Sequence, residues 1–149
     1  MPTLDVPVTS SFNQKSTVPW KRVILAAFLS EVSVLVVLSV VLLTHRFVIE
    51  PGLTADQYQQ FGQRASYDVA PPAAALATFV FALWAAGNRG TRSLSTGLLV
   101  GVAATLLTIG FVFGARPEDR LMYGVSYMLR IAAGYCAGLL AQKRQLRSS

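Results

Sequence analysis

Four long apolar stretches, separated by shorter polar ones, set the pattern of this sequence. The first runs from Val23 to Thr44 and contains a single charged residue, Glu31. An α-helix rises ~1.5 Å per residue, so this stretch reaches about 33 Å, close to the ~30 Å hydrocarbon core of a bilayer. The other stretches are Val69–Ala86, Leu94–Ala115 and Leu121–Ala141. The pattern predicts an all-α integral membrane protein, a bundle of four transmembrane helices.

The connection between the first two spans, about His45 to Tyr67, carries the signature of a helix start. Thr54 is a suitable N-cap, and Gln57, three residues later, completes a capping box. Beyond them the residue types segregate to two helical faces: Tyr58, Phe61 and Ala65 on one, and Asp56, Gln59 and Gln63 on the other. We expect a short amphipathic helix in this outer loop, which either lies on the bilayer surface or closes the top of the bundle.

The second span has a start signal of its own. Asp68 is a suitable N-cap, and its charge complements the helix dipole. Pro71 and Pro72 then fall in the first turn, where a missing N–H costs little. We therefore expect a separate helix to begin near Val69.

Composition supports a lipid-embedded chain. Only 13 % of its 149 residues are charged, against about 25 % in soluble domains, and the mean hydropathy is +0.50. The net charge is +6, but the basic residues sit at the ends of apolar stretches and the aromatic residues do not interleave with them. We therefore expect the lipid bilayer, and no nucleic acid, as a partner.

The distribution of Lys and Arg predicts the orientation. Eight of them fall before the first span, between the second and third, and after the fourth: Lys15, Lys21, Arg22, Arg89, Arg92, Lys143, Arg144 and Arg147. By the positive-inside rule both termini are cytoplasmic. We expect a multi-pass protein of a plasma (inner) membrane, with residues 17–142 as the transmembrane domain, residues 1–16 as a flexible cytoplasmic tail and residues 143–149 as a basic one.

Glycines recur at the spacing that lets helices approach closely in lipid. The third span contains Gly97/Gly101 and Gly110/Gly114, two small-xxx-small pairs. In the fourth span Gly134 and Gly138 share a helical face with Tyr127 and Arg130. These faces predict tight helix packing, within this chain or in a homo-oligomer.

Two charges lie deep in the predicted spans. Glu31 is ~12 Å from the cytoplasmic end of the first span and Arg130 is ~16 Å from that of the fourth. A lone charge at such depth costs roughly several kcal/mol. We therefore expect a Glu31–Arg130 ion pair, with Ser30 and Tyr127 satisfying the remaining donors and acceptors. Its role has two interpretations, a device that sets helix register or an intramembrane site for protons or ligands.

The segment AAFLSEV, Ala26 to Val32, resembles the start of the small multidrug-resistance exporters. In that family a lone glutamate in the first of four helices binds protons and cationic drugs in turn, across an antiparallel dimer. The likeness covers these seven residues only. The large first loop, the arginine in the last span and the lack of the family's third-helix aromatic motif depart from the family, so we do not assign the chain to it.

Catalytic and cofactor signatures are absent from the sequence. A membrane b-type haem needs two histidines, and this chain has only His45, at the end of a span. One cysteine, Cys136, allows no intrachain disulfide and no cysteine metal cluster. We expect a non-enzymatic protein without a cofactor, an accessory or assembly subunit with a membrane-protein partner or a homo-oligomer. The alternative is a small transporter or channel whose polar site is Glu31 and Arg130.

Overall fold

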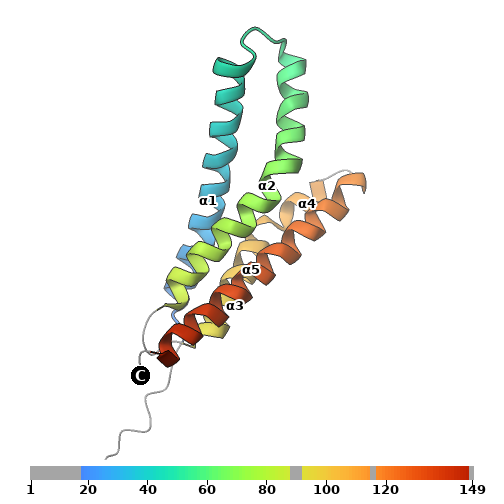
Figure 1. Cartoon of the computed structure of the whole chain (residues 1–149). Coiled ribbons are helices and arrows are strands. Elements are labelled where there is room, and N and C mark those ends of the chain that lie inside the picture. The colour runs from blue at the N-terminus through green and yellow to red at the C-terminus, as the bar shows by residue number, and fades with distance from the viewer. Residues whose placement is uncertain (1–17, 88–91, 115–116, 148–149) are drawn as a thin grey trace, which may run out of the picture.

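The computed structural model describes residues 18–87, 92–114 and 117–147, and these form helices joined by short connections (Figure 1). In chain order they are α1 (Trp20–Thr44), the π-helical turn η1 (His45–Ile49), α2 (Ala55–Ala86), α3 (Ser93–Thr108), α4 (Gly110–Gly114), the 3-10 turn η2 (Pro117–Asp119) and α5 (Arg120–Arg147). The predicted tail at residues 1–16, Ala115 at the end of the third span and Arg89 lie outside the described residues.

Four of the described helical stretches are long and apolar enough to cross a membrane. They are Trp20–Ile49, Ala55–Ala86, Ser93–Gly114 and Arg120–Arg147. Large apolar side chains such as Ile24, Val36 and Val40 are exposed on α1. Exposed apolar surface of this extent suits contact with lipid, so the predicted multi-pass, all-helical class is supported.

The short amphipathic helix was a wrong prediction, because α2 is a single helix of 32 residues that includes it. Asp68 lies inside α2 instead of capping it, and Pro71 and Pro72 are interior residues. The Thr54–Gln57 capping box is present, with the Gln57 N–H donating to Thr54 Oγ1 at 3.4 Å and the Thr54 N–H donating to Gln57 Oε1 at 2.9 Å. The helix therefore starts where predicted and then continues, since no helix-ending residue precedes the prolines and α2 packs along α1.

Replacing Thr54 with alanine removes the capping box, so we expect the first turn of α2 to fray. Loss of an N-cap of this type costs about 1 kcal/mol, which corresponds to a several-fold faster hydrogen exchange of amides 55–58. Ser66→Ala is the matched control, because Ser66 is an exposed residue of the same helix whose hydroxyl donates only to the Gly62 carbonyl. Unchanged exchange at amides 55–58 in Thr54→Ala would contradict the prediction.

The turn between α1 and α2 is shorter than the predicted loop. The helix that starts at Trp20 continues through η1 to Ile49, so His45 lies within it, buried and stacked on Phe61 with ring centroids 3.5 Å apart. The Tyr58 hydroxyl donates to the Glu50 carbonyl at 2.9 Å, and Gly52 adopts φ +101°, a conformation that favours glycine. The two helices therefore form a tightly closed hairpin.

The remaining spans also depart from their predicted ends. The third span is broken at Ile109, where α3 ends and the short α4 follows. In its last turns the Thr105 and Thr108 hydroxyls donate to the Gly101 and Ala104 carbonyls, contacts that bend helices. In contrast, α5 continues through Arg147, so residues 143–147 of the predicted basic tail are helical.

Small residues bring α3 and α5 into backbone contact. A Cβ built on Gly134 would lie 2.5 Å from the Gly97 carbonyl oxygen, and one on Gly101 would lie 2.8 Å from the Arg130 carbonyl oxygen. Gly138 meets the backbone of Leu94 in the same way. No atom of the described chain lies within 4 Å of a Cβ on Gly110 or Gly114, so the prediction of close packing within the chain is wrong for this second pair. The Gly97/Gly101 stripe is covered by α5 and is not open to a second copy.

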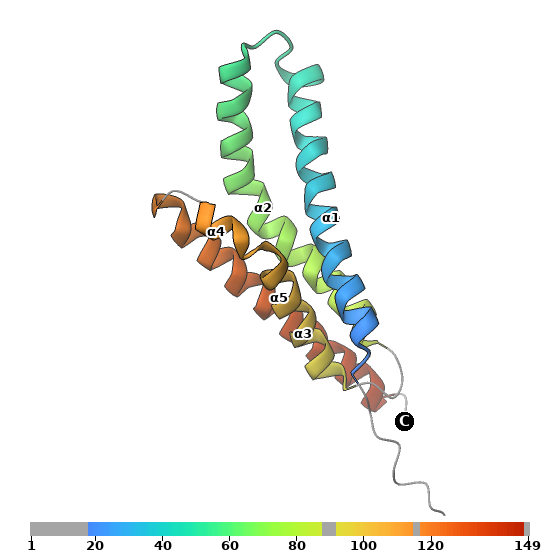
Figure 2. The same ribbon diagram turned by 180° about the vertical axis from the view of Figure 1, so that it is seen from behind.

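The helices meet at one end of the molecule and diverge toward the other (Figures 1 and 2). The end where they meet holds the start of α1 and the end of α5, and its core consists mainly of alanine, with Ala26, Ala82, Ala85 and Ala137 fully buried. Toward the other end the helices separate into two arms. One arm is the α1–α2 hairpin, and the other consists of α3, α4 and α5.

Three helices carry residues that weaken main-chain hydrogen bonding near the level where these arms separate. In α1 the Ser30 and Ser33 hydroxyls donate to the Ala27 and Leu29 carbonyls. The axis of α2 changes direction along its length (Figure 1), and Pro71 and Pro72 are interior residues near the middle of its sequence. Leu42 meets Gly62 across the antiparallel hairpin, and Pro71 is nine residues from Gly62, so it lies level with about Ser33 in α1. The break of α3 at Ile109 follows Thr108, which contacts Arg130 at the same level.

Candidate functional site

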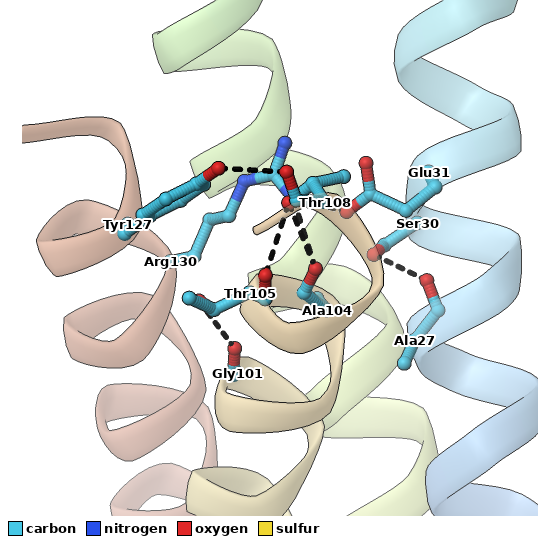
Figure 3. Close-up of polar contacts among 9 residues, drawn as sticks. All are labelled: Ala27, Ser30, Glu31, Gly101, Ala104, Thr105, Thr108, Tyr127 and Arg130. Atoms are coloured by element: carbon cyan, nitrogen blue, oxygen red, sulfur yellow. Dashed lines mark hydrogen bonds and ion pairs between the residues drawn. The ribbon is translucent and has the colours of Figure 1, made fainter. Parts of the chain in front are cut away.

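Glu31 and Arg130 form the ion pair that their depths predicted. Arg130 Nη1 of α5 donates to Glu31 Oε1 of α1, and the two residues are 99 positions apart in the chain (Figure 3). Arg130 is only 6 % exposed, and the Glu31 side chain is 18 % exposed. Each charge neutralises the other at a depth where either one alone would be costly. We call these two residues the charge pair.

The charge pair draws its further hydrogen bonds from α3. Arg130 Nη1 also donates to Thr108 Oγ1 at 3.2 Å and to the Ala104 carbonyl oxygen at 3.3 Å. Arg130 therefore joins α5 to both α1 and α3. Sequence reasoning missed Thr108 and Ala104, since their approach depends on how α3 is rotated about its axis.

Ser30 and Tyr127 do not satisfy the charge pair, which corrects the prediction. The Ser30 hydroxyl donates to the Ala27 carbonyl at 2.8 Å, within its own helix. The Tyr127 hydroxyl donates to the Thr108 carbonyl, also at 2.8 Å, and so joins α5 to α3 without contacting either charged group. Both residues lie beside the charge pair (Figure 3), but their hydroxyl protons are engaged by backbone carbonyls.

The hydrogen bonding of the charge pair is incomplete. Arg130 Nε is buried and has no partner among the described residues. No described residue accepts a hydrogen bond from Arg130 Nη2 or donates one to Glu31 Oε2 either. Buried polar atoms in native structures almost always have partners, so the unpaired Nε atom of Arg130 is unusual.

The charge pair lies on the floor of a cleft of about 1400 Å³ between the two arms. The α1 wall is apolar and includes Val34, Leu35, Leu38 and Leu42. The α2 wall is mixed, with the polar Gln59, Gln63 and Ser66 beside the apolar Phe61, Ala70 and Pro71. The α5 wall contributes Tyr123, Ser126 and Tyr127. The cleft is thus apolar on one side, mixed on the other and charged at its base.

Other reactive side chains do not gather into a site within the described residues. His45 Nε2 lies 3.7 Å from Glu50 Oε2 at the hairpin tip, and its Nδ1 is buried without a described partner. Cys136 is an exposed, free thiol on α5. In the described ranges no three His, Cys, Asp or Glu side chains come together in the way that a metal ion requires.

Comparisons with known proteins do not place the chain in a family. A scan against protein-family models, a search of the curated proteins and a search of the solved structures each find no match to it.

Proposed function

We propose that this protein is a non-catalytic accessory or assembly subunit of a membrane, in which the Glu31–Arg130 pair sets how the helices pack. The observation that carries the proposal is the way Arg130 contacts both α1 and α3 from α5. A buried ion pair is weak as a source of stability, but it disfavours other helix registers because they would leave a charge unpaired.

The open cleft supports a binding partner for this subunit. Within the described chain, the apolar side chains of α1 that face the cleft have no covering helix on its open side. The tip of α1 and η1 adds Phe47, Val48 and Ile49, all of them exposed. Apolar surface of this kind, next to the polar residues of α2, favours association with a second membrane protein over an isolated monomer.

We further propose a plasma (inner) membrane location with both termini in the cytoplasm. Among the described residues, the end where the helices meet carries Lys21, Arg22, Arg92, Lys143, Arg144 and Arg147 and no acidic residue. The described acidic residues other than Glu31 belong to the opposite half of the molecule. Such an asymmetry matches the positive-inside rule, and reporter fusions at each terminus test it.

Extraction of the tagged chain in a mild detergent, followed by native mass spectrometry, tests the subunit proposal. We expect a stoichiometric partner protein or a homo-oligomer, and we expect Glu31→Gln to lower the abundance of the chain in the membrane. A monomeric wild type, together with normal abundance of Glu31→Gln, would overturn the proposal.

A second candidate function is a small transporter or channel, favoured by the position of the charge pair on the cleft floor. Under this candidate Glu31→Gln accumulates normally but loses proton- or substrate-linked flux in liposomes. The charge-swapped variant, Glu31→Arg with Arg130→Glu, separates the two functions because it restores an ion pair. Recovery of folding without recovery of flux would support transport, and flux in neither wild type nor variant would exclude it.

A further inference from the structure

The guanidinium of Arg130 has one occupied side and one unoccupied side. Its Nη1 atom contacts Glu31, Thr108 and Ala104. Its Nε atom is buried and unpaired, and its Nη2 atom has no hydrogen-bond partner among the described residues. The Nε–Nη2 edge of an arginine presents two parallel N–H groups, which is the geometry that carboxylates and phosphates accept in a bidentate manner. Arg130 lines the cleft, but its Nε atom is covered by protein atoms, so this edge can meet an anionic group only when the side chain turns.

Charge balance restricts what the anionic group can belong to. Glu31 and Arg130 together are neutral, so a bare anion on Arg130 would leave a net negative charge in a poorly solvated place. A ligand that also carries a cation restores neutrality. The Glu31 Oε2 atom has no hydrogen-bond partner among the described residues and is the acceptor for that cation. The site therefore selects a zwitterion.

The size and lining of the cleft point to an amphiphile. Pockets for small molecules usually measure about 300–1,000 Å³, and this cleft is larger, at about 1400 Å³. Leu35, Leu38 and Leu42 of α1 offer a surface for a hydrocarbon chain.

We propose, building on the second candidate function, that the cleft binds a zwitterionic phospholipid. The phosphate contacts the Nε–Nη2 edge of Arg130, the ammonium contacts Glu31, and an acyl chain follows the apolar wall of α1. Binding needs the Arg130 side chain to turn so that Nε, now covered by protein atoms, faces the cleft. Lipid retention requires neither a partner protein nor flux. Lipid binding can therefore fail while either proposed function holds, and either proposed function can fail while lipid binding holds.

The experiment measures lipids retained by the full-length protein in native mass spectra. The protein is equilibrated with equal amounts of three lipids that share their acyl chains: phosphatidylethanolamine, phosphatidylglycerol and a trimethylammonium lipid without phosphate. The last two each present one half of the zwitterion. We expect at least fivefold more retained phosphatidylethanolamine than either. Equal retention of the three lipids would overturn the proposal without any mutation.

Arg130→Lys tests the proposed contact, because lysine keeps the charge opposite Glu31 but lacks the planar edge. We expect at least a fivefold loss of the phosphatidylethanolamine preference, with abundance and thermal unfolding close to those of the wild type. The control is Lys143→Gln, an exposed cation at the far end of α5 that would account for unspecific headgroup binding. A preference that survives Arg130→Lys and disappears in Lys143→Gln would overturn the site.

Soluble phosphoethanolamine identifies the source of the zwitterion. Failure of millimolar phosphoethanolamine to displace the lipid supports a membrane ligand held by headgroup and chain together. Displacement that depends on Arg130 supports the same zwitterion site but overturns the role of the acyl chain, since a free zwitterion is then sufficient.

Discussion

Gly134→Ala is expected to disrupt the contact between α3 and α5 and to be among the most destabilising single substitutions in this chain. The added Cβ would lie 2.5 Å from the Gly97 carbonyl oxygen and 3.0 Å from the Gly101 nitrogen. Both are backbone atoms of a packed helix and cannot rotate away as a side chain can. Overpacking in a core costs about 1–3 kcal/mol, and we expect the upper end of this range here. Thermal unfolding of the detergent-solubilised protein measures the loss.

Gly124→Ala is the matched control, since it makes the same substitution in the same helix. Apart from the backbone of its own helix, no atom of the described residues lies within 4 Å of a Cβ on Gly124. Alanine also favours a helix over glycine by about 0.5–1 kcal/mol, so this variant is expected to be as stable as the wild type or slightly more stable. A loss of stability in Gly134→Ala together with an unchanged or raised stability in Gly124→Ala would establish the close approach of α3 and α5. Equal effects would show that these helices are farther apart than described.

Glu31→Gln is the second substitution with a large expected effect, because it leaves the Arg130 guanidinium buried without its carboxylate. Removing one partner of a buried ion pair typically costs about 3–5 kcal/mol. Arg130→Gln should cost a similar amount, since it strands Glu31. The double variant, Glu31→Gln with Arg130→Gln, leaves no charge and should regain much of the loss. A double-mutant cycle on the unfolding free energy measures this coupling.

Glu50→Gln controls for the removal of a carboxylate as such. Glu50 lies at the exposed hairpin tip, 3.7 Å from His45, and its side chain is 59 % exposed. Exposed ion pairs contribute roughly 0–1 kcal/mol, so we expect this variant to unfold near the wild-type temperature. If Glu31→Gln behaved like Glu50→Gln, the charge pair would be sufficiently hydrated that neither residue needs the other.

The sequence could predict those features that depend on distance along a helix. The contact between Glu31 and Arg130 follows from counting residues from the helix ends, because rise per residue is constant. Rotation about the helix axis is set by packing, and for this reason Thr108 and Ala104 were missed as partners of Arg130. Tyr127 was placed on the correct helical face, but which hydrogen bond its hydroxyl makes depends on the neighbouring helix.

Sequence patterns were less reliable where the same residue type occurs in two structural contexts, as proline and glycine do here. Pro71 and Pro72 were interpreted as the start of a helix, and they lie inside one, where tertiary contacts along α1 keep α2 continuous. Gly97/Gly101 and Gly110/Gly114 have identical spacing, yet only the first pair meets another backbone. The spacing permits a close approach but does not supply the opposite helix. The cleft could not be predicted at all, since the divergence of two arms is a property of the assembled bundle.

The prolines of α2 and the hydroxyl contacts of α1 and α3 have a mechanical consequence. Prolines remove main-chain hydrogen bonds, and hydroxyls bonded to helix carbonyls weaken others, so bending costs least at this level of the molecule. The level coincides with Glu31 and Arg130, which therefore sit at the pivot of any such bending. A rotation about a pivot displaces nearby atoms little and distant atoms much. We therefore expect bending to widen or narrow the mouth of the cleft while the two charges keep their contact.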